Sequence, residues 1–169
     1  MRKKRRSTKT FTNNFEKLEL LMSQIGFYRD ENYDLNVQGI KISSLAEKYG
    51  TPLFIYDASL MKERYNVFLE TIKEVKGNIH YAVKANDALS IISYFAKLGC
   101  GADIVSIGEF EKCVAAGISP QKIIFSGVGK DKDEIEIALK NNVLQFNIES
   151  EEELNDISEI SSRLKITAN

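Results

Sequence analysis

Two hydrophobic periods alternate along most of the chain. Short apolar runs, which predict β-strands, are followed by longer segments whose apolar residues recur every three or four positions and predict amphipathic helices. After residue 58 the runs are "IHYAVK", "GADIVS", "KIIFSG", "VLQFNIE" and "LKITA". They begin roughly every 20 residues, which is the length of one strand, one helix and two short loops. This rhythm predicts an α/β protein with a parallel sheet.

Residues that favour helix ends locate the predicted helices. The first covers about 61–75, and others are predicted at about 107–116, at about 131–139 and after Ser150, which starts a capping box. The chain thus has four full strand–helix units and the start of a fifth. A closed barrel needs eight units and about 250 residues, so the count alone favours an open, doubly wound sheet.

The first 57 residues predict smaller elements. Residues 1–34 read as a basic arm followed by an accessory helix, whose apolar positions have helical spacing. Residues 35–57 are expected to form a short strand, a short helix and the compact strand "PLFIYD". A capping box from Ser44 to Glu47 would start that helix, and Gly50 would end it.

Composition and charge narrow the class of protein. With 169 residues, 43% of them hydrophobic and 28% charged, the chain can form one compact domain with a core. A net charge of -1 argues against a general polyanion binder. The basic arm is therefore interpreted as a solvated tail rather than a nucleic-acid or membrane anchor, although a transit sequence stays open.

Several kinds of site and segment are not expected. No apolar run is long enough to cross a bilayer and the basic arm lacks the apolar stretch of a secretory signal, so we expect a cytoplasmic protein. Cys100 and Cys113 are not in a Cys-x-x-Cys arrangement and are expected to be reduced, partly buried thiols. His80 is the only histidine, which argues against a histidine-rich metal site, and we expect no metal.

Lys84 has an unusual place in this pattern. In "IHYAVKAND", Ile79, Tyr81 and Val83 alternate with more polar or smaller residues, and the strand is expected to end with Lys84 at its carboxyl end. Both barrels and open sheets place their active sites at that end. An isolated lysine there is most simply an exposed edge residue. The alternative is a nucleophilic amine that attacks an aldehyde, which a partly desolvated site would favour.

The neighbouring motifs resemble one family. "YAVKAN" resembles the pyridoxal-phosphate attachment motif of the group IV decarboxylases, which are alanine-racemase-like (β/α)8 barrels. "GADIVSIGEF", "KIIFSGVGK" and "FNIESEEEL" follow in the family's order and spacing, and "ISSLAEKYGTPLFIYD" precedes them. The resemblance covers about residue 35 to the end and reverses the preference for an open sheet. It implies that residues 58–169 form the N-terminal half of a TIM-type barrel.

The resemblance also implies where the cofactor is bound. Lys84 would form the covalent link to the aldehyde of pyridoxal phosphate, and Asp103 would lie near it, where a carboxylate favours a cationic nitrogen. Glu109 matches a glutamate of the same neighbourhood, but a capping box with Ser106 explains it equally well. His80, on the same strand face as Lys84, is the fourth cofactor-site candidate, and a hydrogen-bonded core histidine is the favoured interpretation.

The expected activity follows from the same motifs. "FSGVGK" and "GTPLFIYD" resemble the members that convert meso-diaminopimelate to lysine and CO2, as homodimers with an amino-acid substrate and the cofactor as electron sink. Relatives acting on ornithine, arginine or a carboxylated polyamine, and a non-catalytic remnant or interaction module, are the alternatives. "GVGK" fails the pattern of a nucleotide phosphate loop and is expected to line the substrate mouth.

The resemblance finally concerns the extent of the chain. We expect it to correspond to the N-terminal portion of such an enzyme, without the C-terminal β domain that completes the family's substrate site. Half a barrel exposes strand edges and apolar helix faces. On this ground we expect the chain on its own to be poorly folded or self-associated, and inactive.

Overall fold

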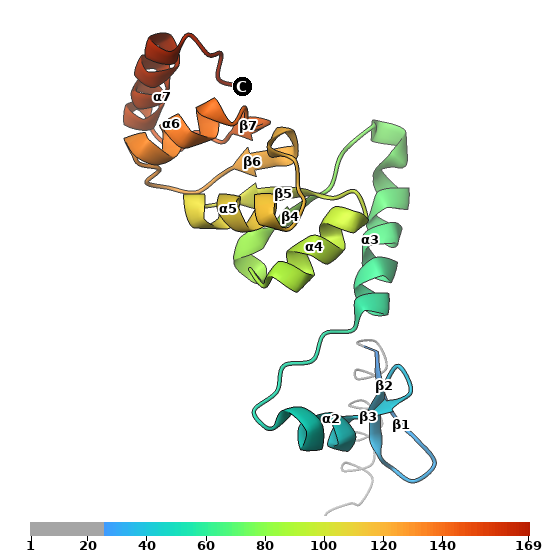
Figure 1. Cartoon of the computed structure of the whole chain (residues 1–169). Helices are drawn as coiled ribbons and strands as arrows, with labels where there is room; N and C mark the ends of the chain where they lie inside the picture. The colour runs from blue at the N-terminus through green and yellow to red at the C-terminus, as the bar shows by residue number, and fades with distance from the viewer. Residues whose placement is uncertain (1–25) are drawn as a thin grey trace, which may run out of the picture. The chain divides into compact units, whose positions relative to one another are not determined.

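The structure, a computed structural model, describes residues 26–169 (Figure 1). The basic arm and the accessory helix that was expected to end at Gly26 lie outside the described residues. The boundary between two compact units falls after Asn66, so unit 1 ends there and unit 2 is Val67–Asn169. Within residues 26–169, no helix is both long and apolar enough to cross a membrane.

Unit 1 contains a small antiparallel sheet and one short helix. Strands β1 (Phe27–Arg29), β2 (Leu35–Val37) and β3 (Ile40–Lys41) pair in sequence order, and α2 (Ile42–Tyr49) follows β3 directly. The β1–β2 turn is held by the Asp30 carboxylate, which accepts hydrogen bonds from the backbone of Asn32 and Asp34. A side chain of the turn thus supplies the hydrogen-bond acceptor for two backbone N–H groups of the same turn, as is common for Asp in turns.

Two local expectations for this region are wrong. Helix α2 begins at Ile42, so Ser44 lies inside it, and no side chain caps the helix at Lys41. Gly50 does end the helix, with φ of 81°. The run "PLFIYD" forms no strand, because none of the described strands pairs with it, and Phe54 is 84% exposed. High β propensity makes a strand only where a partner supplies the ladder of hydrogen bonds.

Asp57 fixes the start of the next helix, α3 (Ala58–Ile72). Its carboxylate is buried and accepts hydrogen bonds from the backbone N–H groups of Ser59 (2.8 Å) and Leu60 (3.2 Å), as an N-cap does. The other oxygen accepts from Gln38 Nε2 at 2.8 Å. Gly26 passes so close that a Cβ there would lie 2.4 Å from this oxygen. One side chain therefore joins the β2–β3 turn to the beginning of α3.

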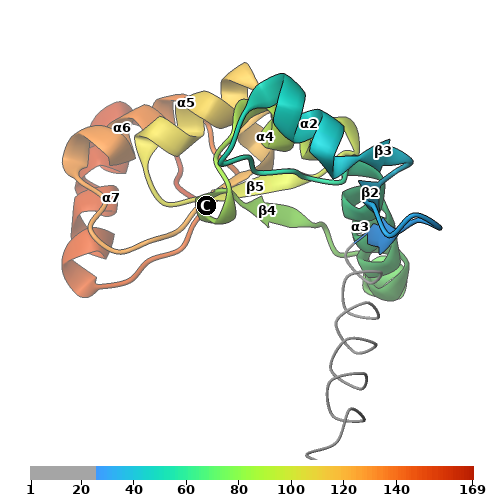
Figure 2. The ribbon, with the colours of Figure 1, turned by 90° about the horizontal axis from the view of Figure 1, so that it is seen from below.

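Unit 2 is built on a parallel sheet whose strands follow one another in sequence order, β4-β5-β6-β7. A doubly wound sheet reverses its order at a switch point, whereas these four strands never do. Right-handed crossovers in one direction place the helices on one face, as Figures 1 and 2 show for α4, α5 and α6. The expected α/β class and the barrel-type arrangement are thus confirmed. The elements are β4 (His80–Ala82), α4 (Leu89–Lys97), β5 (Gly101–Ile104), α5 (Ile107–Ala115), β6 (Ile123–Phe125), α6 (Lys132–Lys140), β7 (Gln145–Phe146) and α7 (Glu151–Leu164), with 3₁₀ turns η1 (Lys73–Val75), η2 (Val83–Ala85) and η3 (Pro120–Lys122).

The core of unit 2 lies between this sheet and its helices. Its largest side chains without solvent exposure include Phe125 on β6, Ile92 on α4 and Ile135 on α6. Phe125 and Phe146 of the neighbouring strand β7 stack with ring centroids 6.1 Å apart. The run "LKITA" forms no strand; the Phe146 N–H of β7 donates at 2.8 Å to the carbonyl oxygen of Asn169, the residue after this run, and no strand pair results. The strand expected there is therefore wrong.

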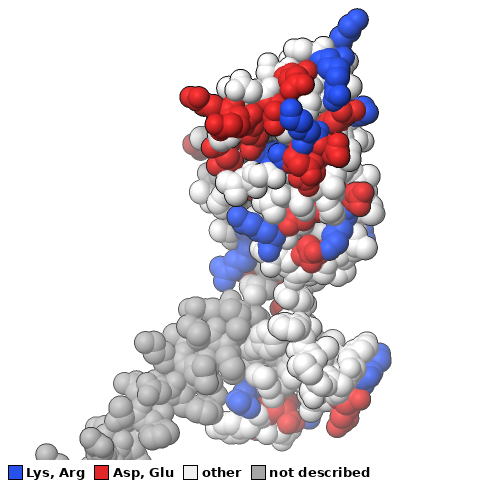
Figure 3. Space-filling model, turned by 90° about the vertical axis from the view of Figure 1, so that its left-hand side faces the viewer, with Lys and Arg blue, Asp and Glu red and all other residues white. Residues whose placement is uncertain are grey.

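Two kinds of contact hold successive helices together. The Glu134 side chain completes the capping box of α6 with Asp131, and its other oxygen accepts from the Ile107 N–H at the start of α5, at 2.8 Å. On the surface, Lys132 of α6 pairs with Asp156 and Glu159 of α7. Figure 3 shows acidic and basic side chains mixed over the upper part of the molecule. Exposed pairs of this kind contribute about 0–1 kcal/mol each.

Replacing Asp57 by alanine should lower the free energy of unfolding by about 1–2 kcal/mol at pH 7, because α3 loses its cap. The hydrogen bond from Gln38 and those from the backbone hold the pKa of the Asp57 carboxyl below its usual value. This stabilisation is therefore fully present above the unfolded-state pKa of about 3.9 and lost as the pH falls through the folded-state pKa. Urea unfolding at pH 7 and at lower pH should show the difference narrowing with acid.

The matched control for this variant is Glu63→Ala, an exposed acidic residue of the same helix. It should leave the free energy of unfolding within about 0.5 kcal/mol of wild type. A loss in Asp57→Ala that stays the same from pH 7 to below the folded-state pKa would contradict the role of the ionised carboxylate.

Candidate functional site

Lys84 follows the end of β4 rather than lying in the strand. The strand ends at Ala82, and residues 83–85 form the turn η2, in which Val83 is fully buried. The turn is closed by the Asn86 N–H, which donates to Val83 O at 3.0 Å. Lys84 is exposed, so the expectation of a strand residue in a partly desolvated site is corrected. The buried Val83 side chain anchors the turn, so the Lys84 amine lies at the carboxyl edge of the sheet and is accessible.

Asp103 is brought to the same edge by the register of the sheet. It lies on β5, where it pairs with Ala82 of β4, two residues before Lys84. Its side chain is half-buried, and one carboxylate oxygen accepts a hydrogen bond from the Ser126 hydroxyl. Lys84 and Asp103 thus leave adjacent parallel strands on the side where α/β proteins place their sites.

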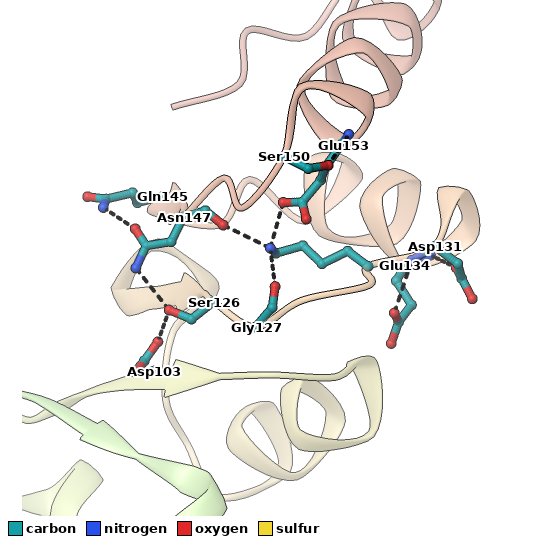
Figure 4. A network of polar contacts seen from close by, with 10 residues as sticks. Asp103, Ser126, Gly127, Asp131, Glu134, Gln145, Asn147, Ser150 and Glu153 are labelled. Carbon is teal, nitrogen blue, oxygen red and sulfur yellow. Dashed lines mark hydrogen bonds and ion pairs between the residues drawn. The ribbon is translucent and has the colours of Figure 1, made fainter.

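A row of polar side chains continues from Asp103 across the sheet. Asn147 Nδ2 donates to Ser126 Oγ at 2.9 Å, and Gln145 Nε2 donates to Asn147 Oδ1 at 2.6 Å (Figure 4). Ser126 and Asn147 each come directly after a strand, β6 and β7. Sequence reasoning missed both, although each is the first polar residue after a buried strand, which is the signal that could have found them.

Glu109 is engaged in starting helix α5. Its N–H donates to Ser106 Oγ at 3.3 Å, and its carboxylate accepts from the Val105 N–H at 2.8 Å. The capping interpretation is therefore confirmed for the Ser106 side chain, while the returning bond reaches one residue further back than a capping box requires. The cofactor role of Glu109 stays a prediction.

His80 lies at the opposite end of β4 from Lys84. It is the first residue of the strand, and its ring borders a cavity of about 140 Å³ with Asn78, Gln121 and Lys122. Its Nδ1 is buried and has no hydrogen-bond partner among residues 26–169, so the expected hydrogen-bonded histidine is wrong. The strand direction separates His80 from Lys84 and Asp103, because a parallel strand carries its two ends to opposite edges.

Lys130, in the loop between β6 and α6, points into the protein. Its side chain is 1% exposed, and its ammonium donates to Glu153 Oε1 (2.7 Å), Gly127 O (2.8 Å) and Asn147 O (2.8 Å). Its neighbours are Glu153 and two loop carbonyls, so the ammonium itself does not line a substrate mouth. Glu153 also donates its N–H to Ser150 Oγ at 3.1 Å, so the Ser150 cap expected for α7 is present. The Glu153 carboxylate accepts its hydrogen bond from Lys130.

Lys84 and Asp103 fit a cofactor that carries an aldehyde and a nitrogen that can be placed near a carboxylate. The accessible Lys84 amine can form a covalent bond to a carbonyl carbon, and Asp103 can stabilise a cationic nitrogen close by. Ser126 and Asn147 hold the Asp103 carboxylate in one orientation. Among residues 26–169, no group of three or more His, Cys, Asp or Glu side chains could hold a metal ion.

Comparison with known proteins gives a family match. The model of the family described as "Pyridoxal-dependent decarboxylase, pyridoxal binding domain" matches residues 58–168. Proteins named diaminopimelate decarboxylase are 38% identical over 142 residues in Vibrio cholerae and 49% identical over 124 residues in Helicobacter pylori. These alignments cover 84% and 73% of this chain, and 34% and 31% of the relatives.

Solved structures agree with the sequence comparisons. The crystal structure of diaminopimelate decarboxylase from M. jannaschii in complex with L-lysine matches with a TM-score of 0.81 and 36% identity. The match covers 85% of this chain and 34% of that chain. The chain therefore spans about a third of the length of the relatives it matches.

The Ser126→Ala variant should lower the free energy of unfolding by about 1–2 kcal/mol, because Asp103 loses its donor and Asn147 its acceptor. Urea unfolding checks this value. Ser158→Ala, an exposed serine of α7, is the matched control and should be close to wild type. Equal stability of the two variants would mean that the row of polar side chains does not hold together in solution.

Gly101→Ala should be destabilising by about 2 kcal/mol or more, because a Cβ at Gly101 would lie 2.4 Å from His80 Nδ1 and 2.5 Å from Lys122 O. Gly108→Ala in α5 is expected to stabilise the fold instead. Its nearest contact would be Ser106 Oγ at 3.9 Å, so the gain in helix propensity should stabilise by roughly 0.5–1 kcal/mol. Thermal unfolding of both variants distinguishes these signs, and a tolerated Gly101→Ala would refute the close approach of His80.

Proposed function

Because the chain belongs to the pyridoxal-dependent decarboxylases, through their pyridoxal-binding domain, we propose that residues 58–169 supply the amino-terminal half of a pyridoxal-phosphate-binding barrel. The protein it serves would be a decarboxylase that converts meso-diaminopimelate to lysine and CO2. The observation that carries the proposal is Lys84 of "YAVKAN", which is accessible at the carboxyl edge of the sheet, two residues after the strand that pairs with the strand of Asp103.

The chemistry follows from the residues at this edge. Bound pyridoxal phosphate supplies an electron sink for the pair of electrons left when CO2 departs. Lys84 would hold the cofactor through its aldehyde, with Nζ as the nucleophile, and the exposure of this amine would leave a substrate amine access beside it. The Asp103 carboxylate favours the protonated state of a nearby nitrogen, and the Ser126 hydroxyl fixes the direction of that carboxylate.

The choice of diaminopimelate rests on the relatives. Those reported above carry the name diaminopimelate decarboxylase at 36–49% identity. A structure of lysine/ornithine decarboxylase from Vibrio vulnificus matches at 21% identity, which supports a common fold and no substrate. Decarboxylation of ornithine, arginine or a carboxylated polyamine is therefore the second candidate among enzymes, and a non-catalytic remnant is the candidate outside them.

A homodimeric, cytoplasmic enzyme completes the proposal. The dimer follows from the family resemblance. Both cysteines are free and buried, and burial raises the pKa of the Cys100 thiol to about 11 and that of Cys113 to about 12. Neutral, buried thiols fit a reducing compartment, where disulfides are rare.

Borohydride reduction in the presence of pyridoxal phosphate tests the proposal. The wild-type chain should carry one dominant adduct, located by peptide mass on Lys84, because this amine alone is expected to form a specific covalent site. Lys84→Ala should lose that adduct, and Lys97→Ala, at the end of α4, should keep it. Adducts scattered over many lysines, or equal labelling of Lys84→Ala, would contradict the proposed site.

Release of CO2 from carboxyl-labelled substrates separates the candidate functions. Meso-diaminopimelate, ornithine and arginine are offered in turn, with pyridoxal phosphate and without borohydride, to the whole decarboxylase that this chain is proposed to serve. Release from diaminopimelate alone is the expected result. Release from ornithine or arginine would favour the second candidate, and an adduct without release from any substrate would favour the remnant.

A further inference from the structure

The buried ion pair of Lys130 and Glu153 has a second effect besides joining the β6–α6 loop to α7. We propose that this pair is a positioning device for the candidate site: it holds the backbone of Asn147, whose side chain then fixes Ser126 and, through Ser126, the Asp103 carboxylate. This inference rests on the proposed function, since it assigns Lys130 and Glu153 to the same site.

The contacts of the ammonium define the device. Lys130 Nζ has three protons and three acceptors within 2.8 Å, one in its own loop (Gly127 O), one after β7 (Asn147 O) and one on α7 (Glu153 Oε1). The side chains of Lys130 and Glu153 are 1% and 7% exposed. A buried ammonium needs such full compensation, so its position determines where the three acceptors lie.

Asn147 transmits this constraint to the site. Its N–H donates to Phe125 O at 2.9 Å and its carbonyl accepts from Lys130, so its backbone is fixed on both sides. The side chain is then held between Gln145 and Ser126, and Ser126 donates to Asp103. Figure 4 shows the contacts that lead from Glu153 to Asn147 and on through Ser126 to the Asp103 carboxylate.

The exposed ion pairs of Lys132 serve as a comparison for the buried pair of Lys130 and Glu153. Lys132 also joins α6 to α7, through Asp156 and Glu159, but it is exposed and touches neither Asn147 nor Ser126. Its Nζ is at 3.0 and 3.1 Å from the two carboxylates. If the Lys130 pair only tied the two helices together, removing the Lys132 pair would have effects of the same kind.

The test removes both buried charges at once. In the full chain, Lys130→Met is combined with Glu153→Leu, so no unpaired charge is left inside, and such replacements can keep the fold. Lys132→Met is the matched control. Amide hydrogen exchange is followed by NMR at Ser126 and Asn147, together with the side-chain amide signals of Asn147. The yield of borohydride-trapped pyridoxal phosphate on Lys84 is measured in the same samples.

The expected result is a local effect. In the double variant, exchange at Ser126 and Asn147 should rise at least about tenfold, the Asn147 side-chain signals should shift, and the Lys84 adduct should fall about fivefold or more. Exchange at the core residue Ile135 should change less than exchange at these two positions, and Lys132→Met should match wild type in all three measurements.

Every other result refutes a specific part of the proposal. Unchanged exchange at Ser126 and Asn147 in the double variant, or an unchanged Lys84 adduct despite faster exchange, refutes the positioning role. If the wild type itself forms no Lys84 adduct, the proposed function fails, and the exchange data still decide whether Lys130 holds Asn147.

A second variant covers the case in which the double variant does not fold. Asn147→Ala keeps the ion pair and the backbone contact but removes the link to Ser126. It should reproduce the loss of the Lys84 adduct while exchange around Lys130 stays as in wild type. A full yield of adduct in Asn147→Ala would refute the proposed path.

Discussion

The charge of the Lys130 ammonium must be compensated inside the protein, and the loops at the carboxyl edge of the sheet are arranged around that requirement. An isolated buried ammonium would be far too costly, so one carboxylate and two carbonyl groups converge on it from segments that are distant in sequence. The loop after β6, the residue after β7 and the first turn of α7 therefore share one geometry. The polar residues of the candidate site lie directly beside that shared point.

Parallel pairing explains why the other site residues meet. Residues about 20 positions apart in sequence become neighbours when strands run in the same direction and in register. Ala82 pairs with Asp103, and Phe125 with Phe146, so the residues that follow these strands emerge at one edge. The apolar positions of the same strands fill the core, with Phe125 and Phe146 in contact. Packing and site geometry are thus two consequences of a single register.

The sequence predicted those features that depend on local pattern. Helix α5 and strand β5 were expected nearly where they occur, because periodicity and capping residues are local signals. Lys84 could be singled out by its place at a strand end and by the family resemblance, and Asp103 by the resemblance alone. Features that need a partner elsewhere in the chain were not predictable: "PLFIYD" and "LKITA" have strand composition but no ladder, and the bond between Lys130 and Glu153 joins residues 23 positions apart. The same holds for His80, whose distance from Lys84 follows from where β4 begins.

Glu134 imposes a condition on the length of the loop that precedes it. One carboxylate accepts from Asp131 at the start of its own helix and from Ile107 at the start of the preceding helix. The helical position of Glu134 therefore has to be correct for two helices at once. Inserting or deleting a single residue between β6 and α6 would rotate this side chain by about 100° around the helix axis relative to α5, so the bond to the Ile107 N–H would be lost while the Asp131 and Ser106 caps remain. The spacing of this loop is consequently much less tolerant of change than that of an ordinary surface connection.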